Sequence, residues 1–160
     1  MILGGSDSPG SPQDNLEIWN PGSKEGCILD KKLLRIGAPI CGNLICGGFG
    51  EKDMSFSKDK NLQSCLLLDP NTGFIKTDVE LKRKRYNHMC WKNKKGVLLI
   101  GGVMSVDKGE TDGGFKNTEL VSLDGSSSEP SFNLQYGMDS GYKGCGVDLE
   151  DGRFVIIGQN

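Results

Sequence analysis

The chain has 160 residues, enough for one domain with a substantial core, and its formal net charge is −2 with 25% charged residues. This balance provides no overall attraction to nucleic acid or to an anionic membrane surface. No apolar stretch approaches the roughly 20 residues of a membrane span, so no membrane segment is expected. The N-terminus lacks the pattern of a signal peptide, which fits a cytosolic protein or a chain that begins partway into a longer one.

In chain order, the first half alternates apolar runs that end in glycine with second apolar segments. ILGG (2–5) precedes NLEIWNP (15–21), and NLICGG (43–48) precedes NLQSCLLLDPNTG (61–73). The runs are short, aliphatic and bounded by glycine, which predicts buried β-strands. The Asp-Pro-Asn-Thr-Gly sequence that closes the fourth segment predicts a turn.

The second half repeats the same order. VLLIGG (97–102) precedes NTELVSLDG (117–125), and FVIIG (154–158) is the last run. The polar stretches between the segments predict surface loops of unequal length. No window has the spacing of an amphipathic helix, so the chain is predicted to be all-β. A repeat of roughly 40 to 50 residues is typical of β-propellers.

This order of parts resembles the Kelch repeat family of β-propellers. In that family a hydrophobic strand runs into Gly-Gly, a loop leads to a strand with acidic or aromatic residues, and Leu, Arg and often His precede the next strand. The positions that match are Gly4, Gly5, Glu17, Trp19, Arg35, Gly47, Gly48, Arg85, His88, Trp91, Gly101, Gly102, Glu119 and Gly158. The last repeat departs from the pattern, because Ser140 and Lys143 stand where Arg and His are expected and Gln159 replaces the second glycine.

The resemblance implies a Kelch-like β-propeller segment of about three four-stranded antiparallel blades. The approximate repeat units are 6–48, 49–102 and 103–158, within one domain spanning residues 1–160. Propellers typically have 4–8 blades, so we expect an incomplete ring whose further blades come from sequence outside this chain. An oligomer of three-bladed chains is a less favoured alternative.

The single histidine raises the question of catalysis, because His88 and Cys90 are two residues apart and share a strand face. A Cys–His nucleophile needs an imidazole that lowers the thiol pKa and a third group that orients it. The family resemblance instead implies that His88 packs and hydrogen-bonds between blades and that Trp91 packs within one. We expect the structural role for both residues.

The residues of this chain do not match a copper or a zinc site. The Kelch resemblance extends to galactose-oxidase-like copper enzymes, which require two histidines, a tyrosine ligand and a Cys–Tyr crosslink. This chain offers one histidine and Tyr86, Tyr136 and Tyr142, so it cannot form that site alone. Cys41 and Cys46 lack the spacing and partners of a zinc site. No metal site and no cofactor are predicted.

Six cysteines allow three disulfides in 15 connectivities: Cys27, Cys41, Cys46, Cys65, Cys90 and Cys145. Their positions beside the repeat landmarks resemble those of secreted invertebrate Kelch-type propellers, which slightly favours disulfides over buried thiols. Cys27 and Cys46 are the preferred pair, since adjacent strands of one blade could hold them. An extracellular location is correspondingly favoured slightly over a cytoplasmic one.

Two basic clusters, KRKR (82–85) and KNKK (92–95), flank a predicted strand. They could share one rim and bind a polyanion, although a solvated face is the more common outcome. The acidic loop at 107–114 departs from the EF-hand pattern at Gly109 and Thr111, so an ordinary loop is expected.

The predicted function is therefore a non-catalytic binding scaffold whose loops contact a protein partner or, for a secreted protein, a glycan. Two alternatives remain open. One is a fragment of a galactose-oxidase-like copper enzyme whose ligands lie outside this segment. The other is the substrate-binding arm of a Kelch ubiquitin-ligase adaptor, with its BTB-type domain upstream.

Overall fold

The computed structural model of the chain describes residues 2–6, 12–18, 22, 27–29, 35, 37–48, 63–69, 75–76, 79–104, 116–135, 145–149 and 151–157. Throughout these ranges the regular elements are β-strands, and every pairing between them is antiparallel. The all-β prediction is confirmed. No helix in the described ranges is long and apolar enough to cross a membrane.

The first sheet is three-stranded, with β1 (Ile2–Ser6), β2 (Pro12–Ile18) and β3 (Cys27–Leu29) in that order. β1 contains the predicted ILGG strand, and β2 begins three residues before the predicted segment at 15–21. Leu16 pairs with Leu3 on one side and with Leu29 on the other. The two predicted strands are therefore neighbours in one sheet.

The first four-stranded sheet consists of β4 (Ile40–Cys41), β5 (Leu44–Cys46), β6 (Cys65–Leu68) and β7 (Ile75–Lys76), which pair in chain order. The two central strands are almost entirely buried. A strand buried on both faces needs a continuous apolar run rather than an alternating one, and LIC and CLLL are such runs.

The second four-stranded sheet consists of β9 (Met89–Lys92), β10 (Val97–Ile100), β12 (Asn117–Val121) and β13 (Ser128–Asn133). All four residues of β10 are buried, whereas β13 is exposed from its second residue onward. β13 lies at the edge of the sheet and contains Pro130, which is tolerated at an edge because no further strand needs its amide.

The C-terminal hairpin pairs β14 (Cys145–Asp148) with β15 (Phe154–Ile157). Burial alternates along β15: Phe154 and Ile156 are half-buried, whereas Val155 and Ile157 are exposed. One face of this hairpin is thus covered and the other is not. A short pair of strands, β8 (Arg85–Tyr86) and β11 (Val103–Met104), lies beside the second four-stranded sheet.

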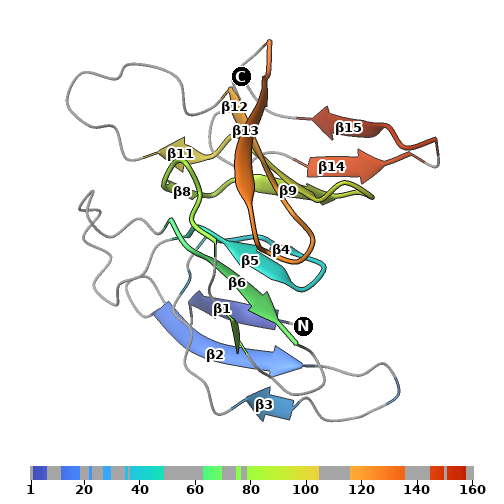
Figure 1. Ribbon diagram of the computed structural model, residues 1–160. Helices are drawn as coiled ribbons and strands as arrows, with labels where there is room; N and C mark the ends of the chain where they lie inside the picture. Colours follow the sequence, from blue (N-terminus) through green and yellow to red (C-terminus); the bar gives the residue numbers. More distant parts are fainter. Residues whose placement is uncertain are drawn as a thin grey trace.

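The two faces of β10 belong to two different hydrophobic cores. Val97 and Leu99 pack with Leu44, Cys46 and other residues of the first four-stranded sheet. Leu98 and Ile100 pack with Phe154 and Ile156 of the C-terminal hairpin. Because alternate side chains of β10 point to opposite faces of its sheet, this strand packs against a neighbouring sheet on each side. The three sheets follow one another in chain order in Figure 1.

The sheets do not coincide with the repeat units read from the sequence. Strands β4 to β7 form one four-stranded sheet, and β9, β10, β12 and β13 form the next, so each sheet has strands on both sides of a Gly-Gly pair in the sequence. The described strands form two four-stranded sheets, one three-stranded sheet and two two-stranded pairs, and they do not close into a ring.

Candidate functional site

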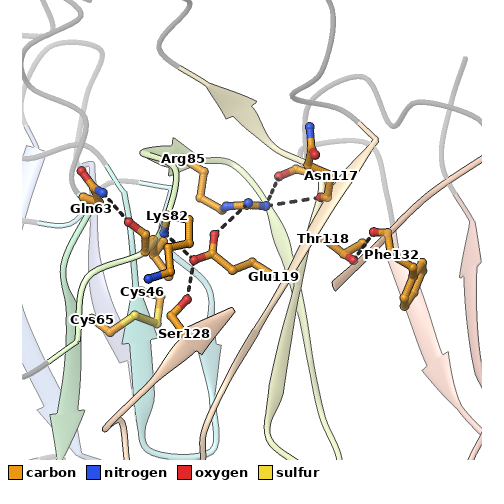
Figure 2. Close-up of polar contacts among 12 residues, drawn as sticks. Cys46, Gln63, Cys65, Lys82, Arg85, Asn117, Thr118, Glu119, Ser128 and Phe132 are labelled. Atoms are coloured by element: carbon orange, nitrogen blue, oxygen red, sulfur yellow. Dashed lines mark hydrogen bonds and ion pairs between the residues drawn. A yellow bond between two sulfur atoms is a disulfide. The ribbon is translucent and has the colours of Figure 1, made fainter. Parts of the chain in front are cut away.

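The best-connected polar cluster is centred on Arg85 and Glu119, both of which are 1% exposed. Arg85 Nη2 lies 3.1 Å from Glu119 Oε2. Arg85 Nη1 donates to the carbonyl oxygens of Gly101 at 3.1 Å and Asn117 at 3.4 Å. Figure 2 shows the guanidinium spanning the ends of β10 and β12. The arginine therefore satisfies strand-end carbonyls that burial has removed from water.

Glu119 is held by two further donors. The backbone amide of Lys82 donates to Oε1 at 2.6 Å, and the Ser128 hydroxyl donates to the same oxygen (Figure 2). A buried carboxylate is costly unless it is both paired and hydrogen-bonded, and here it is both. Burial lowers the pKa of Arg85, and the charge and hydrogen bond of Glu119 oppose that shift.

Arg35 repeats this geometry in the first four-stranded sheet. Its Nη1 donates to the carbonyl oxygens of Gly47 at 2.8 Å and Ser64 at 2.7 Å, and Nη2 donates to Ser64 Oγ at 2.7 Å. Gly47 and Ser64 correspond to Gly101 and Asn117, because the Gly47 and Gly101 amides donate to the Ser64 and Asn117 carbonyls. Burial lowers the pKa of Arg35 to about 10. The two matched arginines thus occupy equivalent places.

The two Gly-Gly pairs have nearly the same backbone. Gly47 and Gly101 have φ of 64° and 63°, and Gly48 and Gly102 have φ of 96° and 93°. These left-handed values favour glycine. A Cβ on Gly102 would lie 2.6 Å from the Cβ of His88, so the close approach of the segment around His88 also requires glycine at this position.

His88 lies between these glycine pairs. A Cβ on Gly47 would lie 3.2 Å from its Cε1, while Gly102 faces its Cβ from the other side. The side chain is buried, and neither ring nitrogen has a hydrogen-bond partner among the described residues. The expected hydrogen bond between blades is therefore not observed there. Burial, with a smaller contribution from the Arg85 charge, lowers the pKa of His88 to about 3, which keeps the imidazole neutral.

The prediction of disulfides is confirmed, but the preferred pair is not the one observed. Cys46 is bonded to Cys65, its direct cross-strand neighbour in β5 and β6, so the expected Cys27–Cys46 bond does not form. Pairing by register places the Cys46 and Cys65 Cα atoms 4.0 Å apart, whereas β3 with Cys27 belongs to a different sheet.

The second disulfide joins Cys41 of β4 to Cys90 of β9, and it links the two four-stranded sheets covalently. Cys90 therefore has no free thiol, and His88 and Cys90 do not form a nucleophile pair. Both bonds are of a kind that persists in oxidising compartments.

Trp91 packs between the second four-stranded sheet and the C-terminal hairpin. Its ring is stacked on Phe154 with a centroid distance of 5.1 Å and an interplanar angle of 8°. The ring of Phe154 in turn covers Gly146, where a Cβ would have no room. The indole Nε1 is buried without a hydrogen-bond partner among the described residues.

The remaining matched positions are seen only in part. Gly4 and Gly5 lie in β1 and Glu17 lies in β2 as backbone positions. Trp19, Gly158 and the acidic loop at 107–114 lie outside the described residues.

The two basic clusters do not share a rim, which corrects the expectation from sequence. They lie at opposite ends of β9, because KRKR ends before that strand and KNKK begins at its last residue. Within KRKR, Arg85 is buried in its ion pair with Glu119. Lys82 and Arg83 are exposed at one end of β9, and Lys92, Lys94 and Lys95 are exposed at the other end.

Four hairpin turns gather at that end: β4–β5 (42–43), β9–β10 (93–96), β12–β13 (122–127) and β14–β15 (149–153). Figure 1 shows them on the right-hand side of the stack. Gly125 of the third turn approaches Leu44 of the first four-stranded sheet, and Lys92 lies against Gly42 of the first turn. Turns from three sheets thus meet at one edge.

An open cleft of about 890 Å³ lies between the β9–β10 and β14–β15 turns. Residues 91–95 form one wall, and Asp148, Leu149, Asp151 and Gly152 form the other. The cleft was not expected from the sequence, which contains its two walls about 55 residues apart and does not show that the hairpins are adjacent in space.

Sequence reasoning also missed Ser64, Ser128 and the Lys82 amide as partners of the buried charges. The sequence gives no signal for Ser64, because aligning NLQSCLLLD with NTELVSLDG at their first residues pairs Asn61, and not Ser64, with Asn117. Among the described residues, no group of three or more His, Cys, Asp and Glu side chains could hold a metal ion. No family model matches the sequence, and a search of curated proteins found no significantly similar relative.

Proposed function

We propose that the chain is a non-catalytic binding scaffold, part of a Kelch-like β-propeller, whose hairpin turns contact a protein partner or a glycan. Consecutive four-stranded antiparallel sheets packed face to face support the propeller assignment. The recurrence of arginine on the carbonyl of the first glycine supports the Kelch assignment, since Arg35 and Arg85 make equivalent contacts.

The main support for a binding role is which polar side chains are buried and which are exposed. The buried polar groups named above take part in packing: Arg85 and Glu119 hold strand ends, His88 is enclosed, and Cys90 is in a disulfide. Exposed charged side chains lie on the turns around the cleft, such as Lys94, Lys95 and Asp151, and also on other parts of the surface. Rigid sheets that present turns in this way are typical of binding scaffolds.

The two disulfides favour an extracellular setting, since cytosolic thiols are usually kept reduced. This supports the secreted scaffold over the ubiquitin-ligase adaptor arm, for which we expect free thiols. Peptide mapping of unreduced protein purified from its native compartment separates the two, because the adaptor requires all six cysteines to react with a thiol reagent.

Site-specific photo-crosslinking tests the binding role. A crosslinking residue is placed at Lys94, which is exposed in the β9–β10 turn, and a matched one is placed at Lys116, which is exposed at the other end of the second four-stranded sheet. We expect the native partner to be captured from Lys94 and not from Lys116. Capture from Lys116 alone would show that the binding surface does not lie on these turns.

The copper-oxidase alternative predicts stoichiometric copper uptake by the full-length protein and hydrogen peroxide formation from a primary alcohol. Both are measured on protein reconstituted with Cu²⁺, by metal analysis and by a peroxide assay. Peroxide formation that requires the bound copper would exclude the non-catalytic proposal.

A further inference from the structure

The cleft between the β9–β10 and β14–β15 turns has the features of a ligand site. Its volume of about 890 Å³ falls within the range typical of small-molecule sites, roughly 300–1,000 Å³. Trp91 and Leu149 contribute apolar surface, and charged side chains lie on both walls. The walls come from two different sheets, so the cleft exists only in the folded stack.

Opposite charges face one another across the cleft without pairing. Lys92, Lys94 and Lys95 are exposed on one wall, and none forms an ion pair with another described residue. On the other wall Asp151 is engaged by Arg153, whose Nη2 lies 2.5 Å from Oδ2, whereas Asp148 forms no ion pair with another described residue. The Lys92 side chain lies against Gly42 of the first four-stranded sheet, so Lys94 and Lys95 are the cations that the lining offers to a ligand, together with the carboxylate of Asp148.

The cationic wall is largely pre-formed. Asn93 Oδ1 accepts hydrogen bonds from the backbone amides of Lys95 at 2.7 Å and Gly96 at 3.1 Å, which fixes the turn that carries the lysines. Pre-organisation of this kind reduces the entropy lost when a ligand binds.

We propose that this cleft binds an acidic saccharide, a chain carrying sulfate or uronic carboxylate groups beside free hydroxyls. The lysine ammonium groups suit the anionic substituents, and Asp148 suits the hydroxyls, because a carboxylate only accepts hydrogen bonds. The edges of Trp91 and Leu149 suit the apolar faces of the sugar rings. An acidic peptide such as poly-glutamate matches less well, since its side chains carry no hydroxyl groups that could donate hydrogen bonds to Asp148. The inference rests on the proposed role as a binding scaffold.

The test measures binding of a heparin hexasaccharide and of hexagalacturonate to the full chain by calorimetry. Lys94→Glu/Lys95→Glu is compared with Lys82→Glu/Lys116→Glu, which changes the net charge equally at exposed positions away from the cleft. We expect the cleft variant to weaken binding at least about tenfold and the control variant to change it less than about threefold. Equal losses in both variants would show non-specific attraction and overturn the proposal.

Asp148→Asn gives a second test, in which recognition and simple charge attraction predict opposite signs. The variant makes the cleft more positive, so simple attraction predicts tighter binding of both oligosaccharides. Asparagine keeps one acceptor oxygen but loses the charge that strengthens hydrogen bonds from sugar hydroxyls, so recognition through this carboxylate predicts weaker binding, by about five- to tenfold, as we expect. Tighter binding, or preference for a poly-glutamate peptide, would overturn the saccharide assignment.

Failure of this inference and failure of the proposed function are distinguishable. If neither saccharide binds while a protein partner is still captured at the turns, the inference fails and the scaffold stands. If the saccharide binds and is cleaved, with cleavage lost in Lys94→Glu/Lys95→Glu, the non-catalytic proposal fails and the cleft assignment stands.

Discussion

Arg85 and Glu119 show how a single pair of residues maintains the junction between strand ends. Each would be costly to bury alone, yet together they satisfy two backbone carbonyls, a backbone amide and a serine hydroxyl. In the first four-stranded sheet, Leu66 occupies the register position of Glu119, since Leu66 pairs with Ile45 as Glu119 pairs with Leu99. The arginine contact therefore recurs while the carboxylate does not.

Glu119→Gln tests the charge of this pair, because glutamine keeps an acceptor for Lys82 and Ser128 but removes the counter-charge of Arg85. We expect a loss of about 3 kcal/mol in the free energy of unfolding, measured by guanidinium denaturation. Arg85→Met/Glu119→Leu should not recover that loss, because it leaves the Gly101 carbonyl and the Lys82 amide without these partners. Asp151→Asn, at an exposed ion pair, should leave the midpoint unchanged, and a Glu119→Gln variant as stable as wild type would contradict the prediction.

His88 provides a measurable pH dependence, since it is the only histidine of the chain. Its pKa is about 3 in the fold and 6.5 when exposed, so between these values the unfolded chain binds a proton that the folded chain does not. Stability therefore falls as the pH decreases through this window, by up to about 1.4 kcal/mol per pH unit from this group.

His88→Phe should remove that contribution and leave stability at pH 7 little changed, because neither ring nitrogen has a partner to lose. Denaturation curves of wild type and variant at pH 7.5, 6.5, 5.5 and 4.5 measure the difference directly, since the carboxylates are common to both. Parallel pH profiles would show that the imidazole is solvated or hydrogen-bonded in the folded state.

At the scale of the elements, the two disulfides perform different roles. Cys46–Cys65 joins neighbouring strands that already pair, whereas Cys41–Cys90 joins two sheets that meet only by side-chain packing. The first closes a separation of 19 residues and the second a separation of 49 residues. Chain-entropy arguments assign more stability to the longer closure.

We expect Cys41→Ala/Cys90→Ala to cost about 4 kcal/mol and Cys46→Ala/Cys65→Ala to cost about 3 kcal/mol in the loop-entropy term. Guanidinium denaturation of both double variants gives the order. Mass mapping of unreduced wild type checks the connectivity first, and a crosslinked peptide that contains Cys27 and Cys46 would contradict it.

At the scale of the molecule, the stack is held together by strands that contribute one face to each neighbour. β10 has both faces covered, whereas β15 has one face covered and exposes Val155 and Ile157. The C-terminal hairpin pairs only with itself among the described strands, and it depends on contacts such as Trp91–Phe154 for its position. An isolated hairpin is only marginally stable in water, so we expect the C-terminal hairpin to open before the two four-stranded sheets do.

Phe154→Ala should loosen the hairpin selectively. Hydrogen exchange at 145–148 and 154–157 should become about thirtyfold faster, which corresponds to roughly 2 kcal/mol of local opening energy. Exchange at 97–100 and 118–121 should be unchanged, and Val155→Ala on the exposed face serves as the matched control. Equal acceleration throughout the chain would show that the hairpin unfolds only with the whole stack.

The sequence by itself determined the all-β class and the position of the aliphatic strands beside glycine, and it only slightly favoured disulfides over thiols. The structure of aliphatic runs such as VLLIGG is determined by nearby residues, because strand propensity and the left-handed conformation of glycine act within a few residues. The tertiary structure alone decided that Cys46 bonds Cys65, that the basic clusters separate, and that a charged cleft forms between two hairpins. These features depend on register and on which sheets are neighbours, and those are set by long-range packing that no local pattern encodes.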